Sequence, residues 1–195
     1  MRDAARQDPR EAPPGAIVDA IADWYAAAGR DLPWRRPAAC AWAVLVSEVM
    51  LQQTPVARVL PAYERWLQRW PTASDLAKAS AGDAVRAWER LGYPRRALRL
   101  HAAATAIVER HGGVVPSQYD QLRALPGIGD YTAAAIAAFA YRQRHPVLDT
   151  NVRRVLARAL GGFAGAAASV TVTERARAEA LLPDDGELAS RFSVG

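Results

Sequence analysis

Hydrophobic positions recur with the 3.6-residue period of an amphipathic helix from Gly15 onward, and no stretch shows the convincing two-residue alternation of a strand. Breakers such as "WPTASD", "HGGVVPS" and "LPGIGD" separate the periodic stretches. The pattern therefore predicts an all-α fold. Its expected helices cover residues 15–28, 41–53, 56–69, 81–90, 95–111, 117–123, 130–141, 151–160 and 173–182.

The same pattern suggests how the chain is organised. Residues 1–14 are polar, which is typical of a flexible lead-in. We expect the helix and loop of 15–40 to pack with an incomplete second helical domain, 41–160 to form the main helical domain, and 161–195 to begin the second domain. The final "ELASRFSVG" begins an amphipathic helix that stops before it completes an apolar face, so we expect a fragment of a longer protein.

Composition and charge narrow the class of partner. The formal charge of +5 and the isoelectric point near 9.9 favour a polyanion, although an arginine-rich composition alone could produce much of this charge. No apolar run reaches the roughly 18 residues of a membrane span, and the N-terminus lacks the apolar core of a signal peptide. We therefore expect a cytoplasmic protein.

Two scarce residue types limit the possible chemistry. Only one of the 25 basic residues is a lysine, Lys78, so a mechanism that needs an amine nucleophile has almost no candidate. The single cysteine, Cys40, cannot form an internal disulfide or hold a thiolate metal cluster by itself. We expect it to be a small buried apolar residue.

The segment "LPGIGDYTAAAI", residues 125–136, predicts a helix-hairpin-helix over 117–141. Gly127 and Gly129, on either side of Ile128, permit a tight turn, and we expect all three residues to take part in DNA binding. The N–H groups freed there and the positive end of the next helix can bind a phosphate. An ordinary helix connection could also use this Pro-Gly pair, but the complete pattern favours a phosphate site.

One carboxylate interrupts an apolar helix. Glu48 lies within "AWAVLVSEVMLQQT", where burying its charge costs several kcal/mol. A carboxyl in an apolar wall has a raised pKa, which suits a general acid, and a helix over 41–53 would place Gln52 on the same face. The alternative is a structural carboxylate paired with an arginine.

A second carboxylate, Asp149, precedes the predicted helix at 151–160. Its position suits an N-cap, although Thr150 or Asn151 could cap the helix instead and leave Asp149 for catalysis.

Two further groups have both a structural and a functional interpretation. The side chains of Arg95, Arg96 and Arg99 could contact phosphates from one helix face or form an ordinary solvated face. The tryptophans at helical spacing are expected in the core. They are Trp24, Trp42, Trp66, Trp70 and Trp88.

Four segments in order resemble the helix-hairpin-helix DNA glycosylases, and specifically the MutY-type adenine glycosylases: "SEVMLQQTPVARVLPAYERW", "LGYPRRALRLHAAA", "LPGIGDYTAAAIAAFA" and "VLDTNVRRVLAR". The resemblance runs from about Ile17 to the end of the chain. It implies a six-helix barrel over 41–160 and a monomer, associated with the nucleoid. The implied partner is double-stranded DNA with adenine opposite 8-oxoguanine or guanine.

The resemblance also implies roles for single residues. Glu48 matches the acid that protonates the extruded adenine, Asp149 the carboxylate that stabilises the positive sugar, and Asn151 an asparagine that orders this site. Tyr131 replaces the lysine nucleophile of the related endonuclease III type, which implies a monofunctional glycosylase without strand cleavage.

Further matches concern the DNA and the base. Tyr93 matches a tyrosine that wedges into the base stack, and Gln53 an amide near the lesion strand. The base pocket is expected to include Trp34, Arg35 and Leu51.

The resemblance also shows what the chain lacks. Family members usually carry four cysteines that ligate a 4Fe-4S cluster, followed by a domain that recognises 8-oxoguanine. Neither is in this chain, so we expect no cofactor here and a C-terminal truncation. Two alternatives stay open, a non-catalytic helix-hairpin-helix fragment that grips DNA and an endonuclease III-type bifunctional enzyme.

Overall fold

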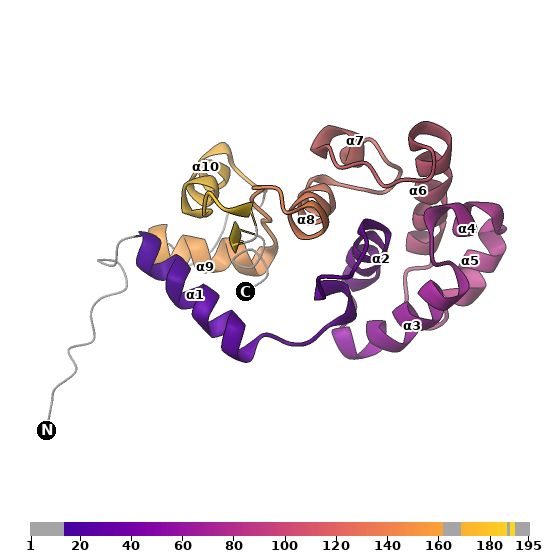
Figure 1. Cartoon of the computed structure of the whole chain (residues 1–195), viewed down its shortest axis with the longest axis horizontal. Coiled ribbons are helices and arrows are strands. Elements are labelled where there is room, and N and C mark those ends of the chain that lie inside the picture. Colours follow the sequence, from indigo (N-terminus) through magenta and orange to yellow (C-terminus); the bar gives the residue numbers. More distant parts are fainter. Residues whose placement is uncertain (1–13, 162–168, 187, 190–195) are drawn as a thin grey trace, which may run out of the picture. The chain divides into compact units, whose positions relative to one another are not determined.

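The computed structural model describes residues 14–161, 169–186 and 188–189 (Figure 1). Within these ranges the chain forms helices and no strand, so the all-α prediction is confirmed. None of the described helices is both long and apolar enough to cross a lipid bilayer. The helices are α1 (Pro14–Ala28), the 3-10 helix η1 (Pro33–Arg35), α2 (Ala41–Leu51), α3 (Val56–Arg69), α4 (Ala73–Lys78), α5 (Ala81–Ala87), α6 (Arg95–His111), α7 (Tyr119–Arg123), α8 (Asp130–Tyr141), α9 (Thr150–Gly161) and α10 (Val172–Leu181).

The chain divides into two compact units. One consists of residues 31–141, and the other combines residues 1–30 with 142–195. The sequence placed these borders at 40/41 and 160/161, whereas α9 groups with the second unit. In that unit α1 packs against α10, and the Arg153 guanidinium of α9 pairs with Glu174 of α10 at 3.1 Å.

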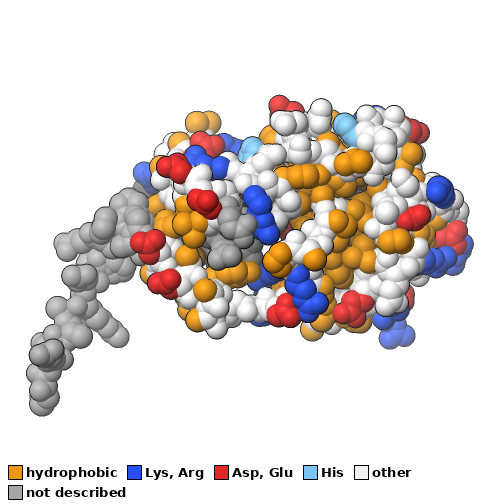
Figure 2. All heavy atoms as spheres, viewed as in Figure 1, with side chains coloured by type: hydrophobic (Ala, Val, Ile, Leu, Met, Phe, Trp, Pro, Cys, Tyr) orange, Lys and Arg blue, Asp and Glu red, His pale blue; other side chains and the backbone are white. Residues whose placement is uncertain are grey.

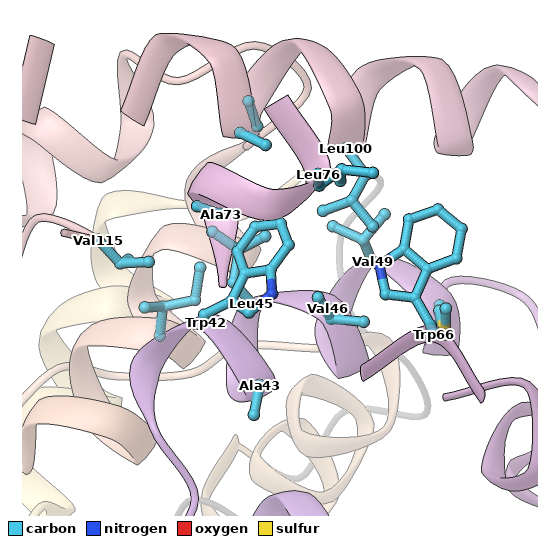
Figure 3. Close-up of a cluster of buried hydrophobic side chains, with 14 of the residues drawn as sticks. Trp42, Ala43, Leu45, Val46, Val49, Trp66, Ala73, Leu76, Leu100 and Val115 are labelled. Atoms are coloured by element: carbon cyan, nitrogen blue, oxygen red, sulfur yellow. The ribbon is translucent and has the colours of Figure 1, made fainter. Parts of the chain in front are cut away.

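Helix α2 lies at the centre of the 31–141 unit. It packs against α3, α6, α8 and η1, and every residue from Trp42 to Met50 is buried. A helix covered on all sides must be apolar on all sides, which explains the run of hydrophobic residues in its sequence. Figure 3 shows Trp42, Leu45, Val46 and Val49 within this core.

Helix α8 supplies the closest partner surface for α2. Its residues Thr132 to Ala138 are buried, and most of them are alanines. Because alanine side chains are short, the two helices can approach closely. This explains the alanine-rich sequence "TAAAIAAFA" without a functional role for it.

Helix α4, Ala73–Lys78, is absent from the sequence prediction, which interpreted "WPTASD" as a breaker. A capping box starts it. The Thr72 hydroxyl accepts from the Asp75 N–H at 3.2 Å, and the Asp75 carboxylate accepts from the Thr72 N–H at 3.1 Å. Six residues are too few to show a hydrophobic period, so the capping pair was the available signal.

Two predictions about which residues lie in the core are wrong. Trp24 was expected in the core, but it is 57% exposed. The more buried face of α1 carries Val18, Ile21 and Tyr25, and Trp24 is not on that face. Cys40 is also exposed, because it precedes α2 in extended conformation, before the first buried turn.

The other four tryptophans are buried, as predicted. Trp66 contacts Trp70 and Trp88 edge-on, with ring centroids 4.7 and 5.5 Å apart. Such pairs add specific geometry to the area that the rings bury.

Acidic and basic side chains lie interspersed on the face in Figure 2. Exposed ion pairs include Arg65 with Glu89 at 2.7 Å and Arg86 with Asp83 at 2.8 Å. Pairs of this kind add little stability, but they neutralise part of the basic excess locally. The net charge therefore does not by itself define a DNA-binding face.

Candidate active site and nucleic-acid interface

Glu48 lies on no exposed face of α2, because other helices enclose this helix. The residue is 7% exposed, and its neighbours Ser47 and Val49 are buried with it. The burial expected from the sequence is therefore confirmed. Its catalytic role stays a prediction.

Gln52, the amide expected on the same face as Glu48, lies just beyond the end of α2. Gln52 is the C-cap of α2, with φ −55° and ψ 111°, so α2 ends two residues earlier than predicted. The Gln52 side-chain nitrogen donates to the Thr132 hydroxyl of α8 at 3.4 Å. This bond ties the end of the helix that carries Glu48 to the first turn of α8, where Tyr131 lies.

The hairpin between α7 and α8 has the expected left-handed turn at one glycine. Gly127 has φ +76°, and a Cβ there would lie 2.6 Å from the Arg99 Cβ of α6. Only glycine fits this position, for both reasons. Gly129 is different: its φ lies outside the left-handed region, and a Cβ would meet nothing within 4 Å. The prediction that both glycines permit the turn is correct only for Gly127.

Ile128 was expected among the DNA-binding residues, but its side chain is buried and its N–H donates to the Leu125 carbonyl at 3.2 Å. The apolar residue anchors the hairpin in the core, so its side chain does not face DNA. Helix α8 begins at this point, since the Gly129 carbonyl accepts from the Ala133 N–H at 2.9 Å. The first-turn N–H groups of a helix are its orphan donors, and they suit a phosphate.

The prediction for Arg96 is wrong. It was expected to contact phosphate beside Arg95, which is exposed, but Arg96 is 6% exposed and shares the inner face of α6 with Leu100. One terminal nitrogen donates to carbonyls at the end of α2, and the other to the turn before α6. The acceptors are the carbonyl oxygens of Val49, Met50, Gln52, Leu91 and Gly92 and the hydroxyl of Thr54.

The surroundings of this guanidinium are polar and aromatic. Burial lowers the pKa of Arg96. The carbonyl oxygens, with the rings of Trp88 and Tyr93 at 5.3 and 5.6 Å from its central carbon, stabilise the charge. This network has no signature in the sequence, because five of its six acceptors are backbone oxygens.

Gln53 and Tyr93 are both exposed and both left-handed, with φ +56° and +50°. Non-glycine residues in this region are uncommon and cost of order 1–3 kcal/mol, so the surrounding structure must hold them there. Tyr93 is 64% exposed, which presents its ring to solvent. Both side chains are accessible to a partner, and their contact with DNA stays a prediction.

The expected base-pocket residues differ in exposure. Trp34 is buried and meets the ring of Tyr63 edge-on at 5.0 Å, which is a core contact. Burial raises the pKa of Tyr63 to about 12. Arg35 and Leu51 are half-buried at the ends of η1 and α2. That these three residues line a pocket for the extruded base stays a prediction.

Asp149 and Asn151 belong to the second compact unit, whereas Glu48 and Tyr131 belong to the first. The Asp149 carboxylate accepts from the Val152 N–H at 2.7 Å, so this residue caps α9. Of the two alternatives left open by the sequence, the cap therefore falls to Asp149 itself. Asn151 is exposed in the first turn of α9.

Comparison with known proteins settles the family. Residues 46–179 match the family described as HhH-GPD superfamily base excision DNA repair protein. The chain belongs to this superfamily. It is 56% identical to the adenine DNA glycosylase of Mycobacterium tuberculosis (strain ATCC 25618 / H37Rv), over 88% of this chain and 56% of that protein. The resemblance to adenine glycosylases expected from the sequence is confirmed.

Other members of the superfamily are similar at greater distance. The thymine/uracil-DNA glycosylase of Pyrobaculum aerophilum is 37% identical over 91% of this chain and 78% of its own length. A solved structure of a thermostable thymine-DNA glycosylase superposes with a TM-score of 0.82 at 25% identity, covering 93% of this chain and 82% of that one. The chain spans about half the length of the mycobacterial adenine glycosylase, at 56%.

The 4Fe-4S cluster expected of full-length adenine glycosylases in this superfamily does not fit the residues of this chain. Such a cluster takes four cysteine thiolates, and the sequence has one cysteine, Cys40, which is exposed. Among the residues that the structure describes, no three His, Cys, Asp or Glu side chains gather as a metal site would require.

Proposed function

We propose that this protein is a monomeric, monofunctional glycosylase that hydrolyses the N-glycosidic bond of adenine opposite 8-oxoguanine or guanine in double-stranded DNA. The observation that carries the proposal is Glu48, a carboxyl that is 7% exposed in an otherwise apolar helix. Identity of 56% to an adenine DNA glycosylase supports the same base.

In the proposed reaction Glu48 is the general acid. Adenine is a poor leaving group from deoxyribose, and the duplex hides its glycosidic bond, so the nucleotide must first be extruded. Glu48 donates a proton to N7 of the extruded adenine. The C1′–N9 bond then breaks, and its electron pair leaves with the neutral base.

Asp149 must be ionised in this reaction, whereas Glu48 must carry a proton. Departure of the base leaves positive charge on the sugar, which an ionised carboxylate stabilises until water adds at C1′ and loses a proton. The α9 cap fixes the orientation of this carboxylate through the Val152 N–H.

Tyr131 makes the reaction stop at base release. Strand cleavage through a Schiff base needs an amine at the sugar, and Tyr131 offers a phenol at the N-terminal end of α8. The one lysine, Lys78, is the last residue of α4. Water is therefore the nucleophile in this proposal.

DNA contact is assigned to the hairpin and the two left-handed residues. The orphan N–H groups at the start of α8 would bind a phosphate, while Gln53 and Tyr93 would enter the base stack on the strand opposite the adenine. Arg95, exposed at the start of α6, would add a phosphate contact.

The test is the identity of the released base. The protein is incubated in excess with duplexes that carry adenine opposite 8-oxoguanine, guanine or thymine, or thymine or uracil opposite guanine, and free bases are separated by chromatography. Adenine from the first two duplexes alone is the expected result. Release of thymine or uracil instead would show the specificity named for the thymine/uracil-DNA glycosylase. DNA binding without base release would support the alternative of a non-catalytic DNA-binding fragment.

A further inference from the structure

One guanidinium holds two of the left-handed residues, Gln53 and Tyr93. The peptide carbonyl directly before Gln53 belongs to Gln52, and the one directly before Tyr93 belongs to Gly92; both accept from Arg96. These carbonyls fix the peptide planes that set the φ of the next residue. The exposed side chains are thus oriented by a buried residue.

The geometry requires a forked side chain. Arg96 Nη1 donates to the end of α2, including Met50 at 3.0 Å, while Nη2 donates to Leu91 and Gly92, both at 3.1 Å. A planar guanidinium presents the donors of its two terminal nitrogens in diverging directions at fixed spacing, whereas a lysine ammonium is a single point. The fork therefore connects two turns that lie about forty residues apart in the chain.

Thr54 strengthens the connection between the turns. Its hydroxyl oxygen accepts from Arg96 Nη2 at 2.9 Å and lies 3.3 Å from two carbonyl oxygens to which it can donate, that of Gln52 in its own turn and that of Leu91 in the other. Trp88 adds a bond from its indole nitrogen to the Gly92 carbonyl at 2.9 Å. The two turns share one hydrogen-bond network, so a change in one is expected to move the other.

We propose that Arg96 is a positioning residue that sets Gln53 and Tyr93 as one unit against DNA, and that recognition of the base opposite the adenine depends on it. Arg96 itself touches no DNA in this account. The proposal rests on the proposed function, because it assigns Gln53 and Tyr93 to the strand opposite the excised base.

The first readout is local and needs no DNA. The N–H groups of Thr54 and Leu91 donate within the two turns, to Leu51 at 3.2 Å and Trp88 at 3.3 Å. Hydrogen exchange of peptides that cover 51–55 and 90–94 reports both turns. In Arg96→Met we expect faster exchange in both peptides. Arg86→Met removes an exposed guanidinium as the matched control, and Leu76→Val gives a general loss of stability outside the turns.

The second readout is lesion preference. Dissociation constants are measured for a duplex with uncleavable 2′-fluoro-adenosine opposite 8-oxoguanine and for an undamaged duplex. Arg96→Met and Arg96→Lys should lower the ratio of the two affinities on the order of tenfold, the size of coupling between contacting residues, whereas Leu76→Val and Arg86→Met should not. In a Tyr93→Ala background the Arg96→Met change should lower the ratio less than it does in the wild-type background, since part of its effect passes through Tyr93.

Each outcome decides one point. Unchanged exchange in either turn of Arg96→Met would overturn the positioning role. Faster exchange in both turns with an unchanged affinity ratio, or full additivity with Tyr93→Ala, would overturn the link to recognition. Wild-type protein with no lesion preference would instead refute the proposed function and with it the recognition role, while the exchange data would still decide whether Arg96 couples the turns.

Discussion

The Asp149 carboxylate accepts a hydrogen bond from the Val152 backbone N–H at 2.7 Å, so the residue proposed to stabilise the sugar cation is also the N-cap of α9. A cap needs only a side-chain oxygen, whereas stabilisation of a cation needs a negative charge. The two roles can therefore be separated by substitution.

Asp149→Asn should keep the cap and lose the charge. We expect nearly unchanged stability in urea but a fall in single-turnover adenine release on the order of 10²- to 10³-fold, comparable with the loss of an electrostatic group at other active sites. Asp149→Ala should also cost about 1 kcal/mol of stability.

Asp185 provides the matched control, because its carboxylate accepts from the Leu188 N–H at 2.8 Å in the same manner. Asp185→Asn should change neither stability nor release. An Asp149→Asn protein that releases adenine at the wild-type rate would refute the electrostatic role.

The two glycines of the hairpin should respond differently to alanine. Gly127→Ala places a Cβ 2.6 Å from the Arg99 Cβ at φ +76°, so we expect a loss of about 1–3 kcal/mol in the free energy of unfolding. Gly129→Ala has open space, and its stability should be unchanged or slightly higher.

Because Gly129→Ala remains folded in this account, its DNA affinity reports on the approach of phosphate to the turn. Weaker binding by this variant, measured by fluorescence anisotropy, would support a phosphate there. Equal tolerance of both alanines in urea unfolding would contradict the geometry of the turn.

In the proposed reaction, the product depends on the residue at position 131. Treatment with borohydride in the presence of substrate duplex should give no covalent adduct for the wild-type protein, because no amine lies at this position. Tyr131→Lys supplies one and should give an adduct that migrates with the DNA on a denaturing gel. An efficient wild-type adduct that disappears in Lys78→Arg would show that the one lysine attacks the sugar, against the account.

Acid should weaken the cap of α5 in a defined window. Hydrogen bonds from Ser80 and Arg86 lower the pKa of Asp83 to about 2 from its usual 3.8. A lowered folded-state pKa gives stability that is fully present above pH 4 and is lost as the pH falls from about 4 to 2. Thermal unfolding at stepped pH should show this loss in the wild-type protein and a smaller one in Asp83→Asn.

Helices with a clear hydrophobic period were predictable from the sequence, and so was the burial of Glu48, because most residues around it are apolar. Helix α4 was not, since six residues carry less than two turns of pattern and the Thr72–Asp75 capping box was their main signal. Short helices of this kind depend on packing, here of Leu76 into the core.

Arg96 shows a different limit. Three arginines at 95, 96 and 99 look alike in the sequence, and only the three-dimensional structure reveals that one of them faces the backbone carbonyls of two turns. Backbone acceptors carry no sequence signature. The Gln52–Thr132 bond between α2 and α8 is hidden for another reason, because its two side chains come from segments 80 residues apart in the sequence.

The central claim is that Glu48 protonates the departing adenine, and single-turnover release from a duplex with adenine opposite 8-oxoguanine tests it most directly. Glu48→Gln removes the acid at nearly constant shape, so we expect release to fall about 10²- to 10⁴-fold while binding to the 2′-fluoro duplex is retained. Release by Glu48→Gln at the wild-type rate would contradict the account.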